Sequence, residues 1–180
     1  DGGDQIAAIV TFVLIPLCLT DSRKNHWFTI TPYSSVKNIL GLFSIWLIRL
    51  QVAIIYFHAA TGKFFVGEWA KGTALYYWFN HSVFGMPVWF SSFANSIMSN
   101  HIVISVLTFG VILLEILIFL GLTASIKYRK RMLIVAIAFH LGIIIFHGIF
   151  SFFFSITAAL ILFLYPTYQT INFTSWFPQK

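Results

Sequence analysis

Apolar residues run through four stretches that approach or reach the length of a membrane-crossing helix. Such a helix needs about 20 mostly apolar residues to cross the hydrocarbon core of a bilayer. The pattern predicts helices over residues 5–20, 36–62 and 102–123, the first of them short, and a further apolar stretch over 132–165. We therefore predict an all-α, polytopic helical membrane protein.

The last apolar stretch is too long for one crossing. As a single helix it would measure about 50 Å, against a hydrocarbon core of about 30 Å. Small residues and phenylalanines replace the Ile/Leu run between Gly148 and Ser155. We expect the break there, which gives a hairpin or re-entrant pair and about four to five membrane segments in the chain.

Composition agrees with a lipid environment and excludes several classes of protein. Of the 180 residues, 59% are hydrophobic and 9% charged, whereas globular domains are about 45–50% apolar and about 25% charged. These values exclude a soluble domain and an intrinsically disordered chain. The single cysteine, Cys18, excludes a disulfide scaffold.

Basic residues indicate the orientation of the chain. Cytoplasmic loops are enriched in Lys and Arg, and two basic clusters lie in residues 21–37 and 124–131. We expect both loops to be cytoplasmic and residues 64–100 to be extracytoplasmic. This topology, with some attraction to anionic lipid, explains the net charge of +6 without a nucleic-acid partner.

The segment over 64–100 mixes aromatic and polar residues in the way that is typical of a membrane–water boundary. We expect Trp69, Gly72 and Trp78 to lie in this interfacial segment. Residues 1–180 form a single membrane domain in this interpretation. The chain opens on Asp1 without an initiator methionine, so we expect it to be part of a longer protein with upstream helices.

Ionisable residues inside apolar spans are costly, at about 2.5–3.5 kcal/mol each, and normally face partners or a cavity. Counted along their helices from the expected cytoplasmic boundary, Arg49, Glu115 and His140 lie at a similar depth of about 12–14 Å in the membrane. We predict an Arg49–Glu115 ion pair with His140 beside it. Such a pair can fix the helix register or take part in chemistry, and the sequence leaves both open.

The helix over 36–62 carries a polar face. Arg49, Tyr56 and Lys63 recur every seven residues and share that face, while Gln51 and His58 form a second polar stripe. A helix polar on two sides is expected to be buried among others. Lys63 could extend toward the headgroups, or act as a base because an amine removed from water gives up its proton more readily.

Histidines suggest a further alternative. His140 and His147 lie about 10.5 Å apart on one helix, too far to bind one metal ion together. A haem would need His147 together with His58 from the other helix, and we favour this least. No cluster of metal ligands, nucleophile elbow or phosphate-binding glycine loop occurs in the sequence, so we expect no metal site.

A family resemblance follows from the segment Arg49–Lys63 and from Glu68-Trp69-Ala70-Lys71-Gly72. With Phe139-His140-Leu141, these residues resemble the HTTM membrane domain shared with vitamin K-dependent γ-glutamyl carboxylase, and among its bacterial branches the SdpB family. Small DoxX-like proteins share the arginine helix that ends in Gly-x-x-Lys. The carboxylase resemblance implies that Lys63 is the base for quinone oxidation, and a quinone-dependent enzyme of this kind could use His140 as proton partner.

The SdpB resemblance implies a membrane protein that helps to mature or export a secreted antimicrobial peptide, together with partner proteins. A polar interior built from Arg49, Glu115 and His140 could hold the peptide or a quinone-like cofactor. The alternative is a quinone-dependent membrane enzyme. We expect no carboxylation, because residues after Tyr165 are too few for the large lumenal domain of the carboxylase. Whether the chain catalyses a reaction is left open.

Overall fold

The computed structural model describes residues 2–20 and 35–166, which form helices and, within these ranges, no strand. The helices are α1 (Gly2–Thr20), α2 (Ser35–Lys63), α3 (Gly67–Ala70), α4 (Ala74–Phe79), α5 (Val88–Met98), α6 (His101–Leu120), α7 (Ile126–His147) and α8 (Phe150–Leu164). Four of them, α1, α2, α6 and α7, are long and apolar enough to cross a membrane. The prediction of a polytopic helical membrane protein is confirmed.

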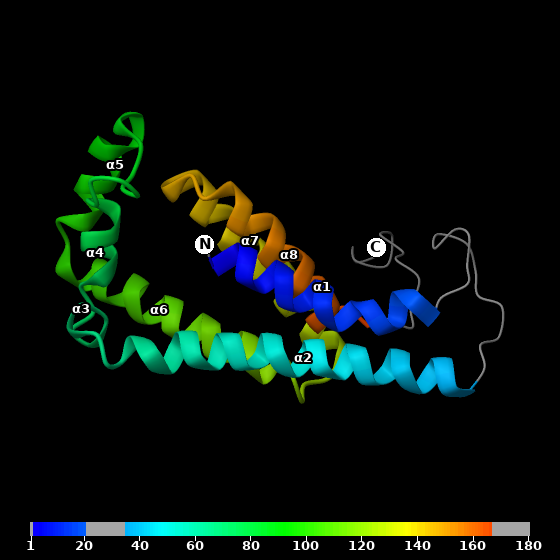
Figure 1. Cartoon of the computed structure of the whole chain (residues 1–180). Coiled ribbons are helices and arrows are strands. Elements are labelled where there is room, and N and C mark those ends of the chain that lie inside the picture. The colour runs from blue at the N-terminus through cyan, green and yellow to red at the C-terminus, as the bar shows by residue number, and fades with distance from the viewer. Residues whose placement is uncertain (1, 21–34, 167–180) are drawn as a thin grey trace, which may run out of the picture.

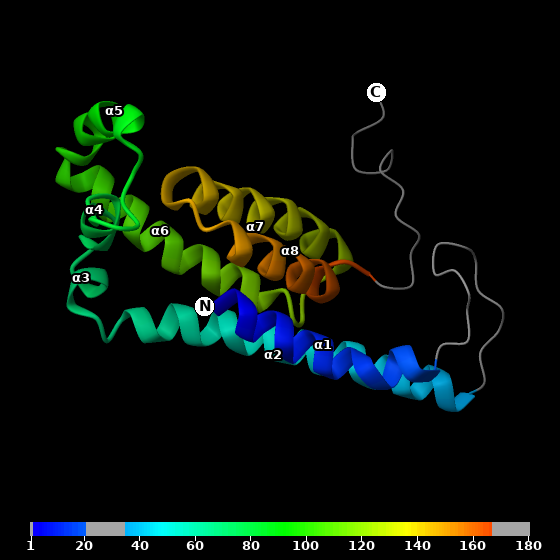
Figure 2. The same ribbon diagram turned by 45° about the horizontal axis from the view of Figure 1, so that its top comes forward.

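The last apolar stretch breaks where small residues interrupt it. Helix α7 ends at His147, and Gly148 has a φ of 69°, a left-handed conformation that glycine adopts without strain. Helix α8 then packs back along α7 (Figure 2), so the predicted hairpin is confirmed. Helix α7 begins at Ile126, earlier than the apolar pattern predicted, because Ser125 caps its first turn through the Tyr128 amide.

Helix α2 is one of the two helices with the most extensive packing in the bundle. It packs against α1, α6 and α8, while α8 also packs against α1 and α7 (Figure 1). Val52 and Ala53 of α2 are fully buried, as are Ala159 and Phe163 of α8. In lipid, close van der Waals packing around small residues holds helices together, and these alanines permit it.

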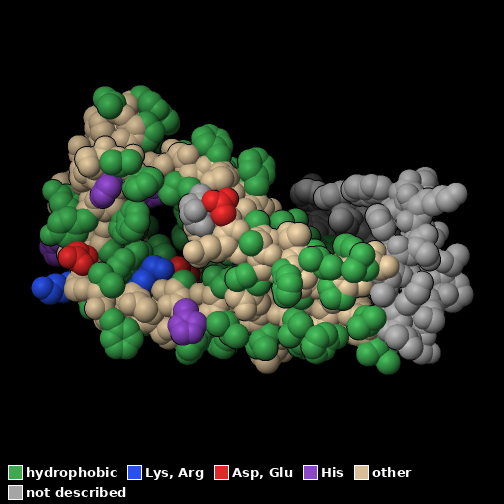
Figure 3. Space-filling view, viewed as in Figure 1, with side chains coloured by type: hydrophobic (Ala, Val, Ile, Leu, Met, Phe, Trp, Pro, Cys, Tyr) green, Lys and Arg blue, Asp and Glu red, His purple; other side chains and the backbone are tan. Residues whose placement is uncertain are grey.

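Much of the surface of the long helices is apolar. Large side chains are exposed along them, among them Phe12 and Leu19 of α1 and Phe43 of α2. Figure 3 shows hydrophobic side chains spread along α1 and α2 on the face in view. In water such a surface would cause aggregation, whereas in a bilayer it faces lipid tails.

Three short helices, α3, α4 and α5, connect the end of α2 to the start of α6 and lie together at one end of the molecule (Figure 1). The turn before α4 lies against α6, because a Cβ added to Gly72 would meet the Phe109 ring at 2.8 Å and Ser105 Oγ at 3.0 Å. Gly72 also has a φ of 72°. Only glycine adopts this positive φ without strain and has no Cβ to meet these atoms. The turn therefore packs closely against α6 and holds the short helices beside it.

Candidate functional site

An ion pair between α2 and α6 is the centre of the candidate site. Lys63 Nζ donates hydrogen bonds to both carboxylate oxygens of Glu115, at 2.7 and 2.8 Å. It also donates to the Ala59 carbonyl, one turn earlier in its own helix, at 3.1 Å. The Cα–Cβ bonds of a helix tilt toward its N-terminus, so the last residue of α2 extends back along the bundle and does not reach away from it.

The pair is enclosed and still partly accessible. The Lys63 side chain is 20% exposed and that of Glu115 is 9% exposed. The Trp69 ring covers the ammonium at 5.0 Å, a distance that permits a cation–π interaction. Figure 3 shows an opening between the α3–α5 end and helices α7 and α8, with basic and acidic side chains at its floor. A polar group of a ligand could therefore reach the pair.

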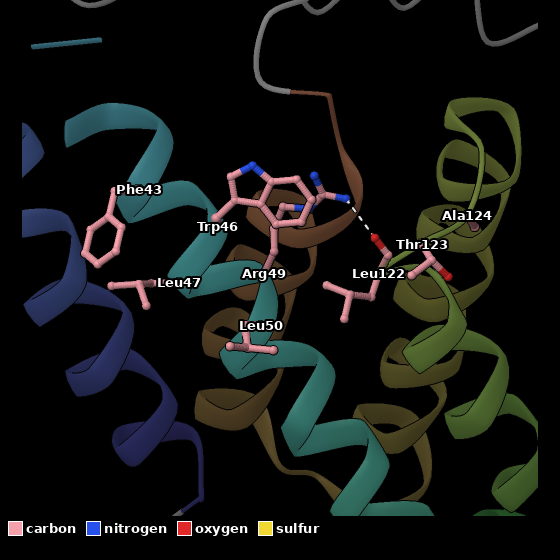
Figure 4. A pocket seen from close by; sticks show the side chains of 8 residues that line it. All are labelled: Phe43, Trp46, Leu47, Arg49, Leu50, Leu122, Thr123 and Ala124. Carbon is pink, nitrogen blue, oxygen red and sulfur yellow. Dashed lines mark hydrogen bonds between the residues drawn. The ribbon is translucent and has the colours of Figure 1, made fainter. Parts of the chain in front are cut away.

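The predicted pair between Arg49 and Glu115 is wrong, because Glu115 binds Lys63. The Arg49 Nη2 instead donates to the Leu122 carbonyl at 3.4 Å, beyond the end of α6 (Figure 4). The depths of Arg49 and Glu115, counted along each helix from an expected membrane boundary, do not give the register of α2 against α6. Helix α2 extends past the end of α6 (Figure 1), so Arg49 lies level with the turn after α6, about 21 Å along α2 from Lys63.

A second polar contact links α2 to α7 within the core. The Tyr56 hydroxyl lies 3.3 Å from His140 Nε2, and both residues are almost fully buried. His140 Nδ1 lies 2.8 Å from the Ala136 carbonyl. A carbonyl only accepts, so Nδ1 carries a hydrogen, and in the neutral imidazole Nε2 accepts from Tyr56.

His58 and His147 lie in different surroundings. His58 is exposed, with its ring against that of Phe57, so the expected burial fails at this residue, whereas Gln51 of the same stripe is partly buried. His147 Nδ1 donates to the Phe84 carbonyl at 2.6 Å, and its ring stacks on Phe79 at 5.5 Å. Among the described residues, no group of three potential metal ligands occurs.

Trp69 and Trp78, the two tryptophans singled out in the predicted interfacial segment, have different roles. Trp69 lies over Lys63, whereas the half-exposed Trp78 contacts the rings of His81 and His147. The end of α7 is thereby joined to the short helices. Trp69, which the sequence marked only as interfacial, belongs to the candidate site.

Arg129 is a buried polar residue that the sequence reasoning assigned to a basic loop. It is only 6% exposed and donates to the Phe163 carbonyl at 2.9 Å and to that of Tyr165 at 3.5 Å. Buried residues of α7 recur with a helical period. They are Arg129, Met132, Leu133, Ala136 and His140. Starting the helix at its Ser125 cap would have placed Arg129 on this stripe.

Comparison with known proteins identifies the family. The HTTM domain matches residues 9–168. The chain belongs to the HTTM domain family. This HTTM domain contains the complete Lys63–Glu115 pair and the Tyr56–His140 contact within the matched range.

Two curated relatives come from Bacillus subtilis (strain 168). The "Uncharacterized protein YitO" is 38% identical over 176 residues, which cover 97% of this chain and 57% of that protein. The "Sporulation-delaying protein SdpB" is 36% identical over 174 residues, covering 96% of this chain and 54% of that protein. The chain thus spans little more than half the length of either relative. No solved structure matches it.

Proposed function

We propose that this HTTM domain is the membrane part of a protein that helps to mature or export a secreted antimicrobial peptide. The similarity to the sporulation-delaying protein SdpB over almost the whole chain carries the proposal. The partners would be the bilayer, the peptide precursor and further proteins of the same system. The cell membrane is the proposed location, with the loops over 21–37 and 124–131 cytoplasmic.

The ion pair provides the chemistry for holding a peptide. Lys63 and Glu115 are joined by side-chain contacts alone, and the ammonium is partly accessible. A peptide carboxylate could take the place of Glu115 at Lys63, or a peptide amine could take the place of Lys63 at Glu115. Each exchange alone leaves the displaced side chain without a counter-charge, so a peptide that offers a carboxylate to Lys63 and an amine to Glu115 together avoids the cost of isolating a charge in a low-dielectric interior.

A quinone-dependent enzyme with Lys63 as base is the second candidate. One observation favours it, since Lys63 is directed inward and covered by Trp69. In the structure, however, the Lys63 ammonium donates to a carboxylate, so Nζ would first have to lose a proton and its contact with Glu115 before it could act as a base. His140 could serve as proton partner only after Nε2 lost its contact with Tyr56. The geometry supports binding more directly than base catalysis.

The gene neighbourhood gives a first test. The proposal expects a gene for a small secreted peptide beside the gene of this protein. If there is no such gene, the peptide role lacks a substrate, and a general membrane enzyme becomes the better explanation.

A secretion assay gives the direct test. Cells that produce the neighbouring peptide and its complete gene set would carry Lys63→Met or Glu115→Gln, and the mature peptide in the medium would be quantified. We expect at least about a tenfold loss for either variant, as for removal of one charge-assisted contact. Lys71→Met and Glu68→Gln alter exposed residues of the same types and should have no effect. Unchanged secretion from both site variants, at equal membrane levels, would contradict the proposal.

Lys63→Arg separates the two candidates. Arginine keeps the cation but does not give up its proton in proteins, so a binding role predicts substantial secretion from this variant. A base role predicts that Lys63→Arg is as inactive as Lys63→Met. That result would overturn the binding role of the ion pair and leave the quinone-dependent enzyme.

A further inference from the structure

The turn between α4 and α5, over residues 80–87, joins the short helices to the end of α7. His147, the last residue of α7, donates from Nδ1 to the Phe84 carbonyl of this turn at 2.6 Å. The ring of Phe146, the preceding residue, contacts one ring of α4 and one of α5, at 5.6 and 5.3 Å. The tip of the α7–α8 hairpin faces α4 and α5 in both ribbon views (Figures 1 and 2). We call this set of contacts the latch.

The latch connects two parts of the molecule that otherwise pack on different helices. Helices α4 and α5 pack against α6, where Ala94 and Met98 of α5 are buried with Ile104 of α6. Helix α7 packs mainly against α8. The opening in Figure 3 lies between these two parts. Loss of the latch would therefore widen the path to the Lys63–Glu115 pair.

His81 holds the turn in the shape that the latch requires. Its Nδ1 accepts from the backbone amides of Val83 and Phe84, each at 3.2 Å, and its own carbonyl accepts from the Gly85 amide at 2.8 Å. The peptide unit between Phe84 and Gly85 thus donates to His81 and accepts from His147. An Nδ1 that accepts carries no hydrogen, so the His81 ring is neutral, with its hydrogen on Nε2.

Acid affects the two histidines of the latch differently. An imidazolium carries hydrogen on both ring nitrogens. In His81 the added hydrogen would point at two amide hydrogens, so two hydrogen bonds would be lost and replaced by repulsion. His147 donates through Nδ1 whether it is neutral or charged, so its bond to Phe84 does not depend on its protonation. Histidine is the side chain that normally changes charge between about pH 5 and pH 8.

The surroundings of His81 contain few other charges. Its ring stacks on that of Trp78 at 6.4 Å, and His147, from α7, contacts the same indole at 6.1 Å. His147 is thus the titratable side chain that α7 contributes to this cluster. Residues 72–114 and 132–179 contain no Asp, Glu, Lys or Arg. The short helices and the tip of the α7–α8 hairpin therefore offer no charged side chain that would stabilise an imidazolium at His81.

We propose that His81 makes the latch sensitive to pH. Neutral His81 keeps the turn against α7 and the opening narrow, whereas protonated His81 releases the turn and exposes the Lys63–Glu115 pair. Because the closed latch needs the neutral ring, it is complete at pH 8 and weakened at pH 5. The proposal concerns access to the pair, so it holds for a peptide and for a quinone alike.

A distance measurement across the opening tests the proposal. Cysteines at Ser82 and Phe150, two exposed positions on its opposite sides, would carry spin labels in a Cys18→Ser background. Pulsed electron paramagnetic resonance would give the distance distribution of the purified protein at pH 8 and at pH 5. We expect a longer distance to gain about tenfold in population at pH 5, because two amide hydrogen bonds are lost.

Two variants of His81 separate hydrogen bonding from charge. An asparagine oxygen accepts from amides two or three residues later in turns and does not titrate, so His81→Asn should stay closed at both pH values. His81→Leu has no acceptor and should be open at both. His101→Asn, at an exposed histidine that begins α6, is the matched control and should respond as the wild type does.

Chemical labelling of Lys63 tests whether the turn controls access. At pH 8, its acylation by a water-soluble amine reagent, relative to that of the exposed Lys71, should be severalfold greater in His81→Leu than in His81→Asn. Mass spectrometry of the digested protein would measure both lysines. Equal acylation of Lys63 in the two variants would overturn the proposal.

The distance measurement can contradict the proposal in two ways. Identical wild-type distributions at pH 8 and pH 5 would show that acid does not open the latch. A pH response that persists in His81→Asn would assign the titration to another group, such as His147. Neither measurement uses a peptide, so both outcomes are independent of the secretion assay.

Discussion

The two ends of α2 stabilise a cation among apolar helices in different ways. At one end, the Lys63 ammonium is neutralised by the carboxylate of Glu115. Toward the other, Arg49 and, on α7, Arg129 donate to backbone carbonyls near the ends of α6 and α8. The last carbonyls of a helix have no intrahelical partner and carry partial negative charge. Backbone carbonyls near a helix C-terminus therefore provide acceptors for these two guanidinium groups.

This difference indicates which end can exchange partners. A carboxylate on a flexible side chain can release its cation to another anion, whereas a carbonyl is fixed in the backbone. Tyr128 follows the same pattern, because its hydroxyl donates to the Leu117 carbonyl at 2.9 Å in the last turn of α6. We infer that the contacts at the helix C-termini maintain the bundle and that the Lys63–Glu115 pair is the adaptable part.

The largest effect on stability is expected from breaking the ion pair on one side only. Lys63→Met or Glu115→Leu leaves one charge poorly compensated in the core and should lower the free energy of unfolding by about 2–4 kcal/mol. The double variant should lose less than the sum of the two. Unfolding in a denaturing detergent would measure all three.

Charge exchange provides the matched control for these single and double variants of Lys63 and Glu115. Lys63→Glu combined with Glu115→Lys should recover part of the lost stability, whereas Arg49→Glu combined with Glu115→Arg should not, since those two residues do not meet. If the Arg49 and Glu115 exchange also recovers stability, those two residues are partners after all, and the assignment of Glu115 to Lys63 is wrong.

A smaller loss is expected from Arg129→Gln. The shorter side chain cannot reach the Phe163 and Tyr165 carbonyls from α7, so buried acceptors lose a charged donor at a cost of about 2 kcal/mol. Arg131→Gln changes an exposed residue of the same helix and should leave the thermal unfolding temperature unchanged. Equal stability of the two variants would show that the contacts at the α8 C-terminus contribute little.

Tyr56→Phe should cost about 1 kcal/mol, because it removes the donor to the buried His140 Nε2 without opening a large cavity. Tyr77→Phe at an exposed position is the control in the same detergent titration. If Tyr56→Phe no longer lowers the free energy of unfolding in a protein that already carries His140→Phe, the effect belongs to this contact. If the losses in stability from the two variants are additive, the effect of Tyr56→Phe does not come from its contact with His140.

The smallest loss is expected from Arg49→Gln, about 0.5 kcal/mol, since its hydrogen bond to Leu122 is long and only partly buried. A loss as large as that of Arg129→Gln would mean that Arg49 belongs to the structural core. The comparison between the two arginines and the Lys63–Glu115 pair would then fail.

The chain's apolar pattern was sufficient to predict the long helices and the break at Gly148, because length and hydrophobicity are properties of each segment alone. The same pattern singled out Lys63, Glu115, Tyr56 and His140, since polar residues in apolar spans are conspicuous. It missed Arg129, which charge alone assigned to a loop, and it placed His58 in the core although that residue is exposed.

Only the tertiary structure decided which polar side chains pair with one another. Glu115 could have met Arg49 or Lys63, and the choice depended on how far α2 slides past α6, a register set by packing between segments about 50 residues apart in sequence. The direction of Lys63, back along α2 and under Trp69, likewise needed the bundle in place. The sequence determined that this protein lies in lipid and which polar groups it places there, while helix packing determined which of them meet.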